Sequence, residues 1–330
     1  MGKKDTVTKE YLRQNTIFAD VFNYAIFNGK QVIQPDQLVD RDVSEIALPF
    51  GKDGALIPVQ RCRDLLKGYV IKEYQGKLLA LLGIESQSEI HYAMPVKCML
   101  YDTLNYAAQV NLKAGEYREK RTKKEQDFKE SPAEFLSGFH AEDKLTPVIT
   151  ITVYWGMDPW DGPRTLKEMF DLELFKEEPE ILNWMPEYRL PLIVPGEIQQ
   201  FEKFQTEFGK TMQFINSAKD KGTMRKLLTT DSAYHSLSRT AAKIINEFTG
   251  LNLRITDEKE DEIDLCKAWE EQRKEDIETG RKEGRKEGRK EGRLDSIKRM
   301  LDKKIPEEQV KELLDATDDE IRQAKEREES

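Results

Sequence analysis

Apolar residues form short continuous runs in the first two thirds of the chain and become sparse towards its end. The run at 78–84 has the length of a buried strand and contains a single glycine. The segment 69–74 just before it is rich in residues that favour β-structure, and the dipeptide Gln75-Gly76 separates the two. This pattern predicts a β-hairpin in which Tyr74 pairs with Lys77.

Three polar side chains fall at the open end of the predicted hairpin. In this pairing Asp64 lies opposite Gln87. Side chains alternate between the two faces of a strand, so Glu85, Gln87 and Asp64 share one face. Two carboxylates and an amide on one face suit a Mg²⁺ or Mn²⁺ ion and a metal-bound water. The alternative is that these are solvated acids at strand ends, and a bulge near Gly68 would disrupt the register.

The elements around the hairpin predict an α/β fold. Apolar residues at helical spacing indicate an opening helix over 8–26, and Pro95 begins a second helix that extends to about residue 111. A further apolar strand follows at 148–155. The order helix, hairpin, helix, strand is typical of an α/β sandwich, in which a central mixed sheet is flanked by helices.

Length and composition predict more than one domain, because 330 residues exceed the usual size of one. We expect an α/β core, a polar helical accessory region, a charged linker and a short helical tail, with bounds 6–195, 196–270, 271–293 and 294–330. The linker repeats Gly-Arg-Lys-Glu three times from Gly280. A glycine at every fourth position costs a helix about 1 kcal/mol per site, which favours a flexible linker over a helix.

Charge is unevenly distributed in the chain. The net charge of −9 does not suggest a nucleic-acid-binding protein. The tract 113–124 is nevertheless basic, with a local balance of +4, and Tyr117 within it could stack on a base. The alternative is a solvated helix end. If the tract binds DNA phosphates, the contacting residues are Lys113, Arg118, Lys120, Arg121, Lys123 and Lys124.

Other chemistries find little support in the sequence. It contains no Walker A loop, no Gly-x-Ser-x-Gly elbow, no His-Glu-x-x-His and no paired Cys-x-x-Cys. The three cysteines and three histidines have no zinc-type spacing, so we interpret them as thiols in a reducing compartment and as ordinary polar residues. There is no apolar leader and no run of membrane-spanning length. We expect a cytoplasmic protein without a membrane partner.

Five distinctive segments follow one another along the predicted core. They are RDLL at 63–66, LGIESQ at 82–87, YAMPVKCMLY at 92–101, TPVITITVYWG at 146–156 and PWDGP at 159–163. Glu-Gly-Arg repeats and a short helical tail follow them. In this order the segments resemble the recombination-promoting nuclease (Rpn), YhgA-like transposase family of the PD-(D/E)xK nuclease superfamily.

The resemblance implies a metal-dependent DNA endonuclease connected with recombination or mobile elements. Asp64 and Glu85 match the metal-binding acids of the family, with Mg²⁺, Mn²⁺ or Ca²⁺ as the ion, and Gln87 occupies the place where the superfamily has a lysine. An acid of the first helix can approach the metals in such folds, which makes Asp20 an additional candidate ligand. The alternative function is a decayed nuclease fold that binds DNA or protein, because glutamine supplies no positive charge. The tail could mediate homo-oligomer formation.

Overall fold

The computed structural model describes most of the chain, and it divides into two units, residues 1–266 and 267–330, which we treat separately. The described residues are 2–41, 44–47, 59–62, 64–71, 77–125, 128–255 and 261–326, without the side chains of 44–47, 59–62 and 71.

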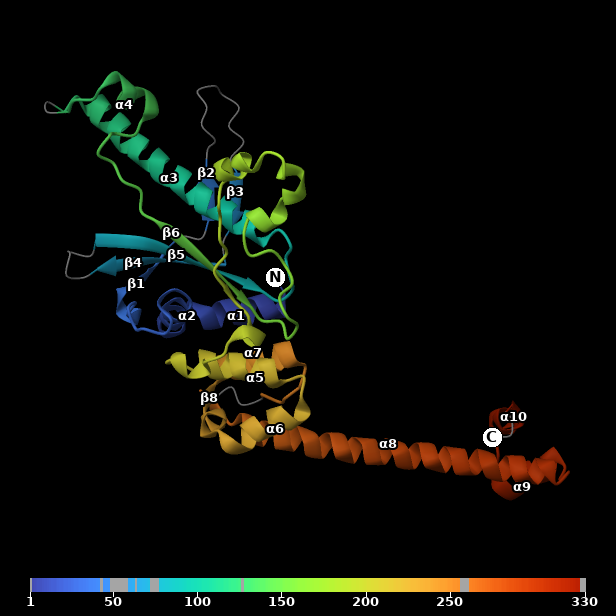
Figure 1. The fold of residues 1–330 in the computed structure, drawn as a ribbon. Helices are drawn as coiled ribbons and strands as arrows, with labels where there is room; N and C mark the ends of the chain where they lie inside the picture. Colours follow the sequence, from blue (N-terminus) through green and yellow to red (C-terminus); the bar gives the residue numbers. More distant parts are fainter. Residues whose placement is uncertain are drawn as a thin grey trace. The chain divides into compact units, whose positions relative to one another are not determined.

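The first unit contains a main sheet, two smaller pairs of strands and several helices (Figure 1). Its strands are β1 (Leu38–Asp40), β2 (Ser44–Ala47), β3 (Val59–Cys62), β4 (Leu65–Ile71), β5 (Lys77–Gln87), β6 (Val148–Tyr154), β7 (Leu192–Ile193), β8 (Leu237–Ser238) and β9 (Glu262–Ile263). Its α-helices are α1 (Lys3–Arg13), α2 (Asn15–Phe27), α3 (Met94–Lys123), α4 (Pro132–Ser137), α5 (Phe208–Ser217), α6 (Lys221–Thr230) and α7 (Arg239–Thr249), and α8 (Leu265–Asp302) begins at its end.

The main sheet has five strands in the order β1-β4-β5-β6-β7. The β1, β4 and β5 strands are antiparallel neighbours, whereas β5, β6 and β7 run parallel. A parallel pair needs a crossover, and α3 provides it between β5 and β6. Helix α3 lies over one face of the sheet, and α1 and α2 lie over the other (Figure 1). The predicted α/β class, a mixed sheet flanked by helices, is therefore confirmed.

The β4–β5 hairpin forms, but with a different register from the predicted one. Ile71 pairs with Lys77 and Leu65 pairs with Ile84, with a bulge next to Tyr69. The predicted turn at Gln75-Gly76 lies outside the described residues. The observed register places Asp64 opposite Glu85 instead of Gln87. Because this differs from the prediction by two positions, Asp64 and Glu85 still belong to the same face.

Aromatic packing joins the opening helices, the sheet and the helices after residue 196. The expected single helix over 8–26 is two helices, because the backbone is extended at Gln14. Tyr11 of α1, Trp155 after β6 and Phe208 of α5 are fully buried against one another. The helices between 196 and 266, expected as a separate accessory region, therefore share the core of the first unit.

The second unit is helical, and the Gly-Arg-Lys-Glu repeat lies within α8, where we had predicted a linker. The glycines of the repeat have open space around them, and the ion pair Glu278–Lys282 at i,i+4 offsets part of the cost of one of them. The end of α8 packs with α9 (Glu307–Leu314) and α10 (Asp318–Glu326) around Ile297 and Val310. Neither α8 nor any other described helix is long and apolar enough to cross a membrane.

Candidate active site

Asp64 and Glu85 interlock at one end of the β4–β5 pair. The backbone N–H of Asp64 donates to Glu85 Oε1 at 3.3 Å, and the backbone N–H of Ser86 donates to Asp64 Oδ2 at 2.8 Å. Asp64 immediately precedes β4, whereas Glu85 lies near the carboxyl end of β5. This end of a strand, where a parallel crossover begins, is the usual place for ligands in α/β sheets.

Each carboxylate has a lysine partner from a different helix. Lys97 Nζ, in the first turn of α3, lies 2.9 Å from Glu85 Oε2. Lys9 Nζ, from α1, lies 2.9 Å from Asp64 Oδ1. The two helices cover opposite faces of the sheet, so the acids lie between two positive charges. Lys9 also pairs with Asp5 of α1, at 3.1 Å, so the cluster holds three carboxylates and two lysines.

Sequence reasoning missed Lys97, although a signal for it was present. A helix that begins a few residues after a strand places its first turn over the carboxyl end of that strand. Met94 begins α3 only seven residues after β5 ends at Gln87. A lysine in this first turn was therefore a candidate for the acids of β5. Lys9 had no comparable signal, because its contact depends on how α1 packs on the sheet.

Burial of Glu85 changes its protonation. Its side chain is 1% exposed. Burial, and then the neighbouring Asp64 carboxylate, raise the pKa of Glu85 to about 7, although Lys97 acts against this rise. Burial also lowers the pKa of Lys97, but attraction to Glu85 outweighs that effect and the net pKa is raised. Near neutral pH the site therefore contains a carboxyl group that readily exchanges a proton beside a lysine that stays charged.

Gln87 borders a small cavity whose lining includes Ser86 but neither Asp64 nor Glu85. Its backbone carbonyl accepts a hydrogen bond from the N–H of Trp155 at 2.9 Å, which fixes the end of β5. The Trp155 indole donates to Ser86 Oγ at 2.9 Å. The cavity has a volume of about 140 Å³ and is lined by Lys4, Asp5, Thr8, Ser86, Gln87, Ser88 and Phe248. Gln87, which follows Ser86 in the strand, can therefore contact a small polar group or water molecules in this cavity.

The structure does not bring Asp20 to this site. Asp20 is 2% exposed and its carboxylate accepts hydrogen bonds from the backbone N–H groups of Gln205 and Thr206. The hydroxyl of Thr206 donates to it as well, at 2.6 Å. These bonds join α2 to the segment before α5, 185 residues away in the sequence. Asp20 thus has a structural role, and the expectation that it approaches the two acids is not met.

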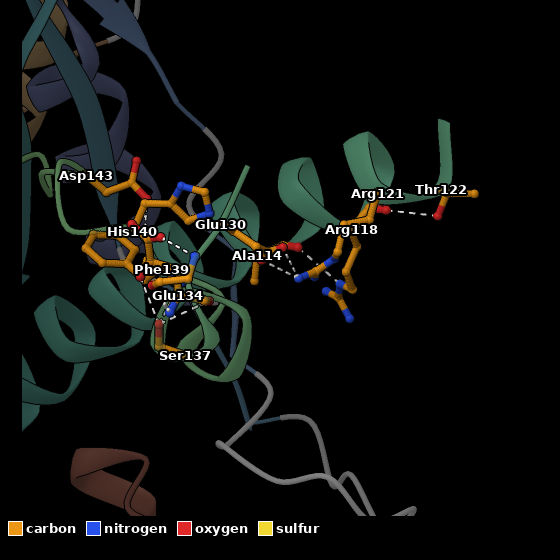
Figure 2. A network of polar contacts seen from close by, with 11 residues as sticks. Ala114, Arg118, Arg121, Thr122, Glu130, Glu134, Ser137, Phe139, His140 and Asp143 are labelled. Atoms are coloured by element: carbon orange, nitrogen blue, oxygen red, sulfur yellow. Dashed lines mark hydrogen bonds and ion pairs between the residues drawn. The ribbon is translucent and has the colours of Figure 1, made fainter. Parts of the chain in front are cut away.

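The basic tract lies at the other end of α3 from Lys97. At 1.5 Å per residue, its residues lie roughly 24 to 40 Å along the helix from Lys97. Arg121 binds both carboxylate oxygens of Glu130, at 2.7 and 2.8 Å, and Figure 2 shows the polar contacts around this pair. Lys113 pairs with Glu116 and Lys123 pairs with Glu119 on this helix.

Two further features of the tract differ from the prediction. The ring of Tyr117 stacks on that of His140 with a centroid distance of 3.6 Å, and its hydroxyl donates to Asp143 at 2.8 Å. This ring is therefore used within the protein instead of being presented to a base. Lys120 lies over the Tyr117 ring, while Arg118 and Lys124 are exposed. These last two are the better candidates for contacts with phosphate.

Comparison with known proteins leaves the fold and the site as the basis for a functional argument. No protein-family model, curated protein or solved structure matches this chain.

Proposed function

We propose that this protein is a metal-dependent DNA endonuclease that hydrolyses phosphodiester bonds, and that Asp64 and Glu85 form its active site. The observation that carries the proposal is the interlocked pair of carboxylates at the ends of two adjacent strands, with Lys97 at 2.9 Å from one of them. Acids from neighbouring strands together with a lysine form the kind of site that the resemblance to PD-(D/E)xK nucleases implies. The mixed sheet with its α3 crossover is compatible with that fold.

The donor set suits a hard divalent cation. Asp64 and Glu85 offer carboxylate oxygens, the ligand type that Mg²⁺ and Mn²⁺ prefer. A bound ion would polarise the phosphoryl group and lower the pKa of a water molecule. Lys9 and Lys97 now neutralise the two acids, so they must shift towards solvent or phosphate when a cation binds. Lys97 is 28% exposed in its side chain and has room to do so.

Lys97 resolves the difficulty posed by Gln87. Glutamine cannot offset the negative charge that develops on a phosphoryl group, but a lysine directed to the same acids can. We assign Lys97 to a phosphate oxygen and Gln87 to orienting the attacking water.

A second candidate function, binding without cleavage, is favoured by a specific observation. Glu85 is nearly inaccessible, and both acids already have lysine partners. A site in which lysines permanently neutralise the acids would be a decayed nuclease fold that binds DNA or protein in a regulatory role. The two functions differ in one respect. Only a nuclease requires the two lysines to move away from the carboxylates when a cation binds.

The two functions can be separated with a fluorescently labelled DNA duplex. We expect binding in Ca²⁺, measured by anisotropy, and cleavage in Mg²⁺ or Mn²⁺, measured by strand length on a denaturing gel. EDTA should abolish cleavage. Asp64→Ala and Glu85→Ala should abolish cleavage and leave the circular dichroism spectrum unchanged. Binding that is independent of metal, without cleavage in any of these ions, would favour the regulatory function. Cleavage that persists in EDTA would indicate a contaminant.

A further inference from the structure

His235, Asp264 and Cys266 come together on the surface of the first unit. One ligand atom from each lies within 4.8 Å of the others. The closest pair is His235 Nδ1 and Asp264 Oδ2, at 3.0 Å. His235 is 29 residues from Asp264 in the sequence, and from sequence alone we interpreted it as an ordinary polar residue.

Strand pairing explains why these residues meet. Leu237 of β8 pairs with Ile263 of β9 in an antiparallel ladder. His235 ends the short 3₁₀ helix Ser232–His235 just before β8, and Asp264 follows β9 directly. The two are therefore at the same end of the ladder. Cys266 lies in the first turn of α8, which begins immediately after Asp264.

The donors differ in kind, and this indicates the ligand. An imidazole nitrogen, a carboxylate oxygen and a thiol sulfur are the ligand types of Zn²⁺, whereas Mg²⁺ and Ca²⁺ select oxygen. The side chains of His235 and Asp264 are 54% and 37% exposed, so an ion can reach them from solvent. The Cys266 thiol donates to the Leu228 carbonyl at 2.9 Å, which holds it near the other two groups.

We propose that His235, Asp264 and Cys266 form a zinc site with water in the fourth position. Zinc bonds of about 2.0 Å to nitrogen and oxygen and about 2.3 Å to sulfur place tetrahedral ligands roughly 3.3 to 3.6 Å apart. His235 Nδ1 and Asp264 Oδ2, at 3.0 Å, are already this close, and the Cys266 sulfur must approach them by at most about 1 Å. On binding, the S–H bond of Cys266 breaks, its proton passes to water and Sγ bonds to the ion. The ion would join the end of β9 and the start of α8 to the segment before β8.

Co²⁺ provides a direct test, because a thiolate ligand gives it a charge-transfer band in the near ultraviolet. We expect reduced full-length protein to develop this band and Zn²⁺ to remove it. Cys266→Ser should lose the band, and His235→Ala and Asp264→Asn should weaken Co²⁺ binding at least about tenfold. Cys98→Ala is the matched control, since Cys98 is a buried thiol elsewhere. It should keep the band, as should Asp64→Ala/Glu85→Ala, which separates this site from the oxygen-ligand site.

The absence of a thiolate band in wild-type protein, or a band that survives in Cys266→Ser, would overturn the proposal. An unchanged affinity in His235→Ala would overturn it as well. A second measurement needs no variant. Zn²⁺ should protect Cys266 of the wild-type protein from alkylation by iodoacetamide, as followed by peptide mass spectrometry. Equal alkylation rates with and without Zn²⁺ would contradict the site.

Discussion

Replacing Glu85 by glutamine should make the protein more stable at alkaline pH while it removes a proposed metal ligand. In the folded protein the pKa of Glu85 is raised from 4.5 to about 7, mainly by burial. In the unfolded chain the carboxyl group titrates near its ordinary pKa. Between these two values the folded state binds more protons than the unfolded state, so the free energy of unfolding falls as pH rises.

The magnitude follows from the difference between the two pKa values. Each pKa unit corresponds to about 1.4 kcal/mol, so wild-type protein loses about 3 kcal/mol of stability between pH values below 4.5 and above 7. Glutamine does not ionise and avoids this loss. Glu85→Gln leaves Lys97 without its partner, but the partly exposed ammonium can turn to water. We therefore expect a net gain of about 2 kcal/mol near pH 8 relative to pH 5.

Urea unfolding followed by tryptophan fluorescence measures this effect, since Trp155 is fully buried and contacts Ser86. The quantity of interest is the difference in unfolding free energy between Glu85→Gln and wild type, at about pH 5 and about pH 8. Glu89→Gln, which changes an exposed glutamate four residues along, is the control and should show no such pH dependence. A Glu85→Gln difference that is the same at both pH values would refute the reasoning about burial.

Three other predictions follow from the same structure. Lys97→Gln should slow cleavage by roughly 100-fold or more with little change in DNA affinity, as measured in single-turnover assays; an equal rate would remove Lys97 from the mechanism. Arg118→Glu and Lys124→Glu should each flatten the slope of log affinity against log salt by roughly 0.9, and an unchanged slope would leave the tract a solvated surface. Truncation after Thr279 should leave the melting temperature and the cleavage rate unchanged. If the tail holds subunits together, light scattering should show fewer subunits per particle; loss of solubility would contradict an independent tail.

Alternation of side chains made part of the site predictable from sequence. Glu85 lies in one strand, and Asp64 lies just before its antiparallel neighbour. Both acids stay on one face when the observed register differs from the predicted register by an even number of residues. The predicted register was wrong by three positions at Ile71, and the bulge next to Tyr69 reduces this difference to two positions from Tyr69 to Leu65. The face survived this error, whereas the partner of Asp64 changed from Gln87 to Glu85.

Contacts between distant segments could not be predicted in this way. Asp20 is an acid on the first helices, which made it a candidate metal ligand. Its hydrogen-bond partners Gln205 and Thr206 are about 185 residues away, and no pattern near Asp20 in the sequence predicts them. His235 and Asp264 meet only through the pairing of two short strands. The repeat around Gly284 was predicted as a linker from glycine propensity, whereas the structure places it inside the helix α8.

If Asp64 and Glu85 form the active site, DNA cleavage depends on both acids. The measurement is the initial rate of nicking of supercoiled plasmid in Mg²⁺, for wild-type protein and for the double variant Asp64→Asn/Glu85→Gln, which keeps the size of both side chains. Wild-type protein should nick the plasmid and EDTA should abolish this nicking, whereas the double variant should give no nicking above background. Equal rates for the two proteins would contradict the proposed site.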